Sequence, residues 1–185
     1  MPAFADRFLP PEAPELLRRV AEYWNARRGT RLMPSFDDLD PTGMPWALSR
    51  MYVLRVRTAE EFVYRLAGEE VARPYGRPLR GARISDLLPE ASARMIQHRW
   101  SRVAREPACC YTNSEHPSTN GRFIAAQRLT MPLGSNGWKA DHILGVACSQ
   151  SISLDAEPTI EGAIIRSVIW RNLATDKVSV EVPSQ

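Results

Sequence analysis

The side chains that could bind a metal or act as nucleophiles are few and scattered along this chain of 185 residues. Cys109 and Cys110 are adjacent, Cys148 lies far away, and no C-x-x-C pair occurs. The spacing therefore predicts neither a zinc site nor a disulfide framework, and it fits a reducing, cytoplasmic setting. All three cysteines fall on expected strands, where a buried cysteine usually packs as a small apolar side chain.

The three histidines do not suggest a metal or haem site either. His98 lies about 200° around its expected helix from Ile96, away from the apolar stripe of that helix. It is therefore expected on the solvated face. His116 and His142 flank turns and are expected to be exposed.

Asp141 and His142 form the pair that comes closest to a catalytic pattern. A catalytic triad needs a Ser or Cys nucleophile that converges with both in space, and no G-x-S-x-G motif is present. A small-molecule enzyme is therefore kept as a second alternative. It predicts a deep polar cleft around these two residues, and it would be excluded if they lay apart on exposed turns.

Gly76 and Gly81 have the spacing that begins a phosphate-binding loop. That loop ends in Gly-Lys-Ser or Gly-Lys-Thr, because the lysine reaches the outer phosphates and the hydroxyl binds magnesium. Ala82 and Arg83 occupy those positions here, and Pro78 removes a backbone N–H donor. The glycines are therefore expected to let the chain turn between short helices.

The expected elements form one antiparallel sheet with helices on one face. Apolar spacing through Leu16, Val20 and Trp24 predicts an amphipathic helix over residues 14–29, followed by a proline-rich linker. Asn120–Gly121 and Asn136–Gly137 are tight-turn signals between strand-like segments. The expected strands are residues 50–56, 61–68, 108–115, 123–133 and 142–153, and a longer helix covers residues 89–106.

The C-terminal tail is ambiguous at the level of sequence. Residues 159–176 are rich in β-branched side chains, yet Ile160, Ile164 and Val168 recur at helical spacing. Both helix and strand remain open, and helix is favoured. Residues 177–182 are expected to form a last short strand.

A ligand pocket is predicted between the sheet and the longer helix, because such a pocket needs apolar walls and a few polar anchors. Gln127 would either tie down a helix carbonyl or a water, or orient a ligand. A shift of one residue in register would turn Arg128 inward instead. The candidate ligand-binding residues are Tyr64, Trp100, Gln127, Leu129, Met131 and Cys148.

The order of strands and helices resembles that of a PAS domain. Across residues 23–146, the segments "YWNARRG", "MPSFDDLDPTGMPWAL", "FVYRLAGEEV", "YGRPLRGARISDLLP" and "RLTMPLGSNGWKADHILGV" resemble, in this order, a mostly stand-alone bacterial PAS family once catalogued as a domain of unknown function. The resemblance implies a non-enzymatic sensor that holds a small molecule, or nothing, between sheet and helices. A flavin photosensor of this type would need a reactive cysteine on a helix, which is not expected here.

These observations predict an α+β PAS fold in three parts: an N-terminal helix and linker (1–45), a PAS core (46–153) and a C-terminal extension (154–185). We expect a cytoplasmic signalling domain without a membrane span, a homodimer through the N-terminal helix, and an unidentified downstream protein. The ligand and any cofactor stay open. The alternative is an adaptor that binds nucleic acid or an acidic surface through a basic helix face, although the net charge is only +3. That face comprises Arg94, His98, Arg102 and Arg105.

Overall fold

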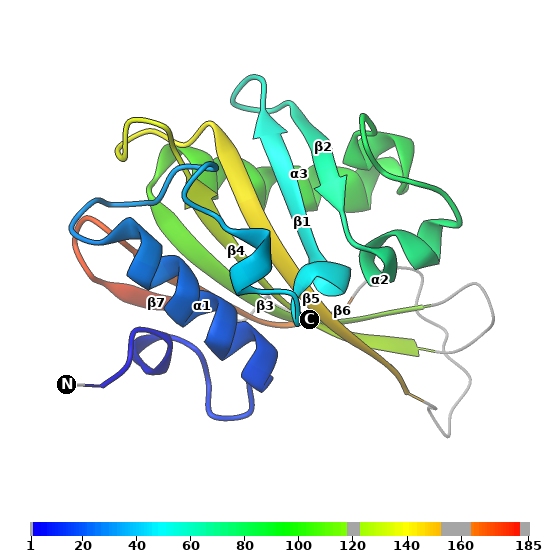
Figure 1. Ribbon diagram of the computed structural model, residues 1–185. Coiled ribbons are helices and arrows are strands. Elements are labelled where there is room, and N and C mark those ends of the chain that lie inside the picture. The colour runs from blue at the N-terminus through cyan, green and yellow to red at the C-terminus, as the bar shows by residue number, and fades with distance from the viewer. Residues whose placement is uncertain (1, 118–122, 153–163, 182–185) are drawn as a thin grey trace.

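The computed structural model of the protein describes residues 2–117, 123–152 and 164–181. Within these ranges, the strands form one antiparallel sheet in the order β2-β1-β5-β4-β3-β6-β7 (Figure 1). The strands are β1 (Met51–Val56), β2 (Phe62–Ala67), β3 (Ala108–Pro117), β4 (Phe123–Leu133), β5 (His142–Ile152), β6 (Ile164–Asn172) and β7 (Val178–Glu181). The helices are α1 (Glu15–Arg28), α2 (Glu69–Ala72) and α3 (Glu90–Arg105), with single 3-10 turns between them.

The predicted α+β fold, with its antiparallel sheet and one longer helix, is confirmed. β1 and β2 form a hairpin, and β3, β4 and β5 pair in succession as a meander. β1 pairs with β5, which joins the hairpin to the meander. The sheet has seven strands rather than five, because the tail of the chain adds two more at the β3 edge.

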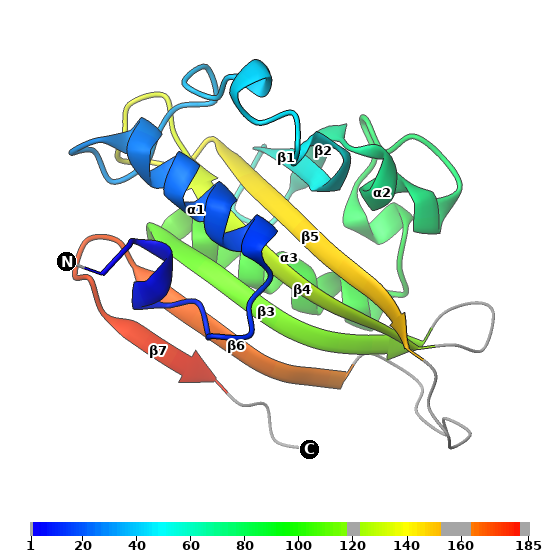
Figure 2. The ribbon, with the colours of Figure 1, turned by 60° about the horizontal axis from the view of Figure 1, so that its bottom comes forward.

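Helices cover both faces of the sheet, and each face has its own apolar core (Figure 2). α1 and the N-terminal segment lie on one face, which we call the α1 side. α3, α2 and the 3-10 turns between these two helices lie on the other, the α3 side. A sheet that is buried on both faces cannot follow the simple alternation of apolar and polar residues. This double coverage decides where the predicted site residues point.

The apolar stripe of α1 is buried against the chain's own sheet. Val20 and Trp24 have no exposed surface, and Leu16 is partly buried against the same core. Trp24 Nε1 donates a hydrogen bond of 3.0 Å to the Pro132 carbonyl of β4. The stripe predicted as a dimer surface is thus part of the intramolecular core. A homodimer would have to use another surface, or α1 would have to leave the sheet.

The favoured helix in the C-terminal tail is wrong. Residues 164–172 form β6, which pairs with β3 along most of its length. Val168 and Trp170 are buried on the α3 side, while Ile169 packs on the α1 side. The buried residues thus alternate as in a strand, although their spacing also fits a helix. The strand forms because the edge of β3 has free backbone N–H and C=O groups with which the tail can pair. Ile160 lies outside the described residues, and the expected last strand is present as β7.

Arg171 of β6 connects the two ends of the chain. It is 2% exposed, and its guanidinium lies 4.5 Å from the Phe4 ring and donates to the Phe4 carbonyl. It also pairs with Asp176 in the turn before β7. A buried charge is tolerated only when it is paired and hydrogen-bonded. The N-terminal segment and β6 are therefore packed as one unit.

Candidate ligand site beneath the long helix

Four aromatic side chains fill the α3 side of the sheet next to the β1–β2 hairpin. The ring centroid of Trp100, from α3, lies 5.7 Å from that of Phe62, 6.1 Å from Tyr64 and 6.3 Å from Tyr52. These four side chains are at most 5% exposed. They form a solid aromatic wall rather than a hollow, so any ligand beneath α3 has to lie beside this cluster, over β4 and β3.

Two arginines lie beside the aromatic wall. Arg128 of β4 is opposite Ala147 of β5 and Thr112 of β3, and it shares the α3 side with the neighbouring Thr130–Cys110 pair. Arg99 precedes Trp100 on α3. Both arginines are partly buried. Arg99 lies on the helix above and Arg128 on the strand below, close enough for the charge of Arg128 to act on Arg99.

Few counter-charges balance these two guanidinium groups. Arg128 Nη1 donates a hydrogen bond of 2.9 Å to Ser114 Oγ. Among the described residues, neither Arg99 nor Arg128 forms an ion pair with a carboxylate. Glu181 is the carboxylate that acts electrostatically on Arg99, but it lies 2.5 Å from Arg102 and is paired there. None of the donors of the two arginines therefore has an anionic partner in the part of the chain described.

The electrostatics of the site reflect this excess of positive charge. Burial lowers the pKa of the Arg99 guanidinium, and the nearby charge of Arg128 lowers it further. Burial raises the pKa of Tyr52 to about 12 and that of Tyr64 well above its usual value, while Arg128 acts in the opposite direction on both. Because their phenols stay protonated at neutral pH, the two tyrosines carry no negative charge that could offset the guanidinium groups.

The structure brings together only some of the predicted site residues. Tyr64 and Trp100 lie on the α3 side, as expected. The other four lie on the α1 side: Leu129 and Met131 are fully buried there, and Cys148 packs against the same core. Gln127, which pairs with Cys148 across the strands, accepts a hydrogen bond of 2.8 Å from the Tyr111 hydroxyl.

The prediction therefore assigned the residues of β4 to the wrong faces of the sheet, which is equivalent to an error of one residue along the strand. The sequence interpretation placed the apolar positions of β4 beneath the one expected layer of helices, but α1 supplies a second apolar cover and takes Leu129 and Met131. Arg128 and Thr130, whose polarity suggested solvent, face α3 instead. The structure thus has the alternative in which Arg128 turns inward, and a period-two pattern alone could not have decided between the two faces of β4.

Asp141 and His142 lie together at the start of β5, but not in the geometry of a triad. Asp141 Oδ1 is 2.7 Å from His142 Nδ1, and Asp141 Oδ2 accepts from both the backbone N and the hydroxyl of Ser135. The carboxylate thus lies between the serine and the imidazole, whereas a triad requires the imidazole to contact the nucleophile.

His142 is also more buried than expected. Its side chain is 13% exposed, its ring lies 5.4 Å from that of Phe36, and Arg65 Nη1 is 3.2 Å from its Nε2. The prediction that His142 is exposed is therefore wrong. His98 is exposed, as predicted, and the side chain of His116 lies outside the described residues. No cluster of three or more His, Cys, Asp or Glu side chains suited to a metal occurs in the described ranges.

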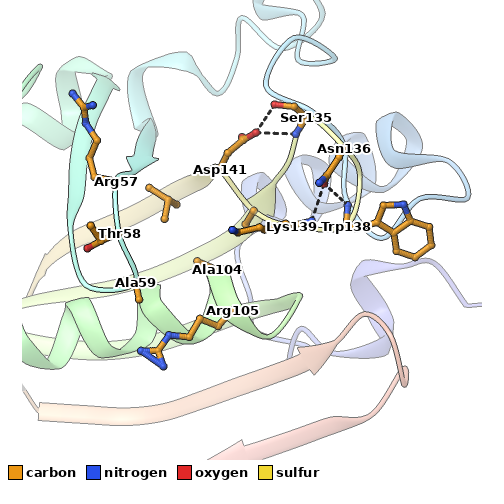
Figure 3. Close-up of a pocket in the computed structure, with 12 residues that line it drawn as sticks. Arg57, Thr58, Ala59, Ala104, Arg105, Ser135, Asn136, Trp138, Lys139 and Asp141 are labelled. Atoms are coloured by element: carbon orange, nitrogen blue, oxygen red, sulfur yellow. Dashed lines mark hydrogen bonds between the residues drawn. The ribbon is translucent and has the colours of Figure 1, made fainter.

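Asp141 lines a surface groove of about 790 Å³ at the end of the sheet (Figure 3). The walls are the β1–β2 turn, the last turn of α3 and the β4–β5 connection. Burial acts to raise the pKa of Asp141, but hydrogen bonds from Ser135 and His142 outweigh it and hold the pKa below its usual value. The carboxylate is therefore ionised and occupied by donors at neutral pH.

The basic face of α3 is less available than its sequence suggests. Arg102 pairs with Glu106 and Glu181, and its guanidinium lies 4.1 Å from the centre of the Trp170 ring. Arg94 pairs with Glu90 one turn away. Arg102 thus connects α3 to β6 and β7. Because its charge is already paired, this face is less suited to an adaptor that binds nucleic acid.

The described part of the chain holds no helix that is long and apolar enough to cross a bilayer. No curated protein matches the sequence. Among solved structures, the LOV protein of Rhodobacter sphaeroides is 13% identical with a TM-score of 0.44, and the alignment covers 59% of this chain and 63% of that one. VqmA of Vibrio cholerae is 15% identical with a TM-score of 0.42, with coverage of 64% and 54%. Both alignments span less than two thirds of the similar protein.

The sequence profile of the PAS domain family matches residues 13–148. This match covers well over half of the chain and includes α1, the β1–β2 hairpin, α3 and nearly all of the β3–β5 meander. Folds of this kind are typically sensory modules that bind ligands or partners. The chain belongs to the PAS domain family.

Proposed function

We propose that the chain is a non-enzymatic sensory domain that binds a small organic anion beneath α3. The observation that carries the proposal is the pair of partly buried arginines, Arg99 and Arg128, beside the aromatic wall. Tyr64 and Trp100 keep their predicted role as wall residues. Gln127, Leu129, Met131 and Cys148 are assigned to the α1-side core instead.

The physical argument is that two guanidinium groups in a partly desolvated space repel each other, and an anion between them removes that cost. Guanidinium groups bind carboxylate and phosphate oxygens in bidentate geometry. Trp100, at the end of the aromatic wall, offers a flat apolar surface for the rest of the ligand. The Tyr75 ring offers a second one, and it lies close enough to Arg128 for that charge to act on its phenol. A small carboxylate or phosphate monoester with an apolar portion fits these groups.

A ligand held in this way would link a helix to a strand. Arg99 belongs to α3 and Arg128 to β4, so an anion that contacts both stabilises one position of α3 over the sheet. A ligand changes an equilibrium only through its different affinity for two states. The position of α3 is thus the proposed output, read by a partner protein or by a second copy of the chain.

The test is native mass spectrometry of the purified protein, followed by thermal unfolding with a panel of small carboxylates and phosphate monoesters. At least one compound should raise the unfolding temperature of the wild type. Arg128→Met and Arg99→Met should abolish that rise. Arg128→Lys, which keeps the charge and loses the fork geometry, should reduce it.

The matched control is Arg94→Met, which alters an exposed arginine on the same helix and should respond as the wild type does. Circular dichroism of each variant without ligand separates loss of binding from loss of folding. The proposal is wrong if no anion of the panel stabilises the wild type, or if a stabilising anion acts equally on Arg128→Met.

A further inference from the structure

We infer that the groove at the end of the sheet binds an extended, acidic segment of a partner protein. The groove lies apart from the region between Arg99 and Arg128, and the inference does not depend on the proposed function. It is lined by Val56–Ala59 of the β1–β2 turn, by Ala104 and Arg105 of α3, and by the β4–β5 connection from Ser135 to Asp141.

The walls of the groove are tied to one another. Ser101 Oγ of α3 donates a hydrogen bond of 2.6 Å to the Ala59 carbonyl in the β1–β2 turn. Val56 N donates to the Asp141 carbonyl at 2.9 Å, which joins the turn to the start of β5. A partner would therefore meet a preformed site, and little binding free energy would be lost in ordering it.

The β4–β5 connection is also held in one conformation. Asn136 Oδ1 accepts from the backbone N–H groups of Trp138 and Lys139 at 3.0 and 2.9 Å. Gly137 adopts a φ of 75°, a left-handed conformation that suits glycine, as the Asn-Gly turn signal predicted. This turn fixes the backbone of the two residues that follow it, Trp138 and Lys139, at the edge of the groove.

Charge complementarity identifies the partner's chemistry. Three cationic side chains line the groove, Arg57, Arg105 and Lys139, and none of them pairs with a carboxylate of the described residues. The single carboxylate in the lining, Asp141, already accepts hydrogen bonds from Ser135 and His142. The groove therefore presents more positive than negative charge, and it would select an acidic ligand.

The arrangement favours an extended chain over a compact anion. Figure 3 shows Lys139 and Asp141 between the β1–β2 turn and Trp138, with Arg57 and Arg105 at separate margins of the groove and their side chains pointing outward. Carboxylates spaced along an extended peptide suit cationic side chains that lie at separate margins of one groove. Trp138 is 67% exposed at the outer edge, and exposed tryptophans at preformed sites are typical anchors of protein interfaces.

The test uses fluorescence anisotropy with a short, fluorescein-labelled, Glu-rich peptide and its Gln-for-Glu counterpart. The Glu-rich peptide should bind in a salt-dependent manner, and the Gln peptide should not. Lys139→Glu and Arg105→Glu should weaken binding by about tenfold each, equivalent to about 1.4 kcal/mol. Trp138→Ala should weaken it without changing the salt dependence.

Two controls identify the surface. Arg94→Glu changes the charge by the same amount at a distance from the groove and should bind as the wild type does. Acetylation of Lys139 should be slowed by the peptide, while Lys177, an exposed lysine on the opposite edge of the sheet, serves as the internal reference. Equal weakening by Arg94→Glu and Lys139→Glu, equal protection of both lysines, or preference for single-stranded DNA or free glutamate would each overturn the inference.

Discussion

At the scale of single residues, Gly145 shows how one position determines the packing beneath α3. A Cβ at position 145 would lie 2.0 Å from Cζ of the Tyr52 ring, a distance that atoms do not reach. Because Tyr52 is itself packed against Trp100, its ring cannot move away freely. We expect Gly145→Ala to lower the free energy of unfolding by about 1–3 kcal/mol, the usual cost of overpacking, measured by urea denaturation. Tyr52→Leu in the same chain should recover part of the loss, and a fully stable Gly145→Ala would contradict this packing.

The buried thiols predict an alkaline loss of stability. Burial raises the pKa of Cys110 to about 12 and raises that of Cys109 strongly, although nearby arginines oppose it. An unfolded thiol titrates near pH 8.5, so above that pH the unfolded chain loses a proton that the folded chain keeps. Stability is then full below about pH 8.5 and falls as the pH rises toward 12, by up to about 1.4 kcal/mol per pH unit for each thiol.

The measurement is the urea midpoint between pH 8 and 10.5. Cys110→Ala should show a shallower decline than the wild type, whatever its stability at pH 8. Cys148→Ala is the control, because Cys148 is only partly buried and its removal should change the slope less. A decline of the same slope in the wild type and in Cys110→Ala would show that this thiol titrates normally in the folded protein.

At the scale of elements, the sequence predicted where strands and helices lie better than which way they face. Asn136–Gly137 marked the β4–β5 turn, because only a few residue types tolerate its backbone angles. The face of β4 was not determined by its alternation, since apolar Leu129 and polar Arg128 are both covered by helices. Only the docking of α1, which depends on contacts far apart in the sequence such as Trp24 with Pro132, resolves that choice.

The tail illustrates the same limit in another form. Its β-branched side chains suit a strand, and its spacing also fits a helix, so local propensity left both structures open. The free edge of β3 decides between helix and strand, because the tail can pair with it. That edge exists only in the assembled sheet, so it cannot be deduced from the sequence of the tail. The two arginines of the candidate site depend on the same kind of information, because Arg99 and Arg128 meet only after α3 has packed on the meander.

At the scale of the whole molecule, the family match ends at residue 148, yet the structure uses the residues after it to complete both cores. Trp170 is buried on the α3 side, and Arg171 holds the N-terminal segment on the α1 side. We therefore predict that a chain truncated after residue 152 loses cooperative unfolding and aggregates, because it exposes the edge of β3 and the surface beneath Phe4. A truncation after residue 181 is the control, and it should unfold as the full chain does.

The readouts of this truncation are the urea transition followed by tryptophan fluorescence and the elution volume in size-exclusion chromatography. Arg171→Met in the full-length chain tests the connection between the two ends separately. It should lower the free energy of unfolding by about 1–3 kcal/mol, because it leaves the Phe4 carbonyl without its buried donor. Asp176 contributes little to this loss, since it is largely exposed and Arg7 stays 3.7 Å away. A truncated chain that elutes as a monomer and unfolds at the wild-type midpoint would show instead that residues 1–152 fold without β6 and β7, which would then be a dispensable addition to the PAS core.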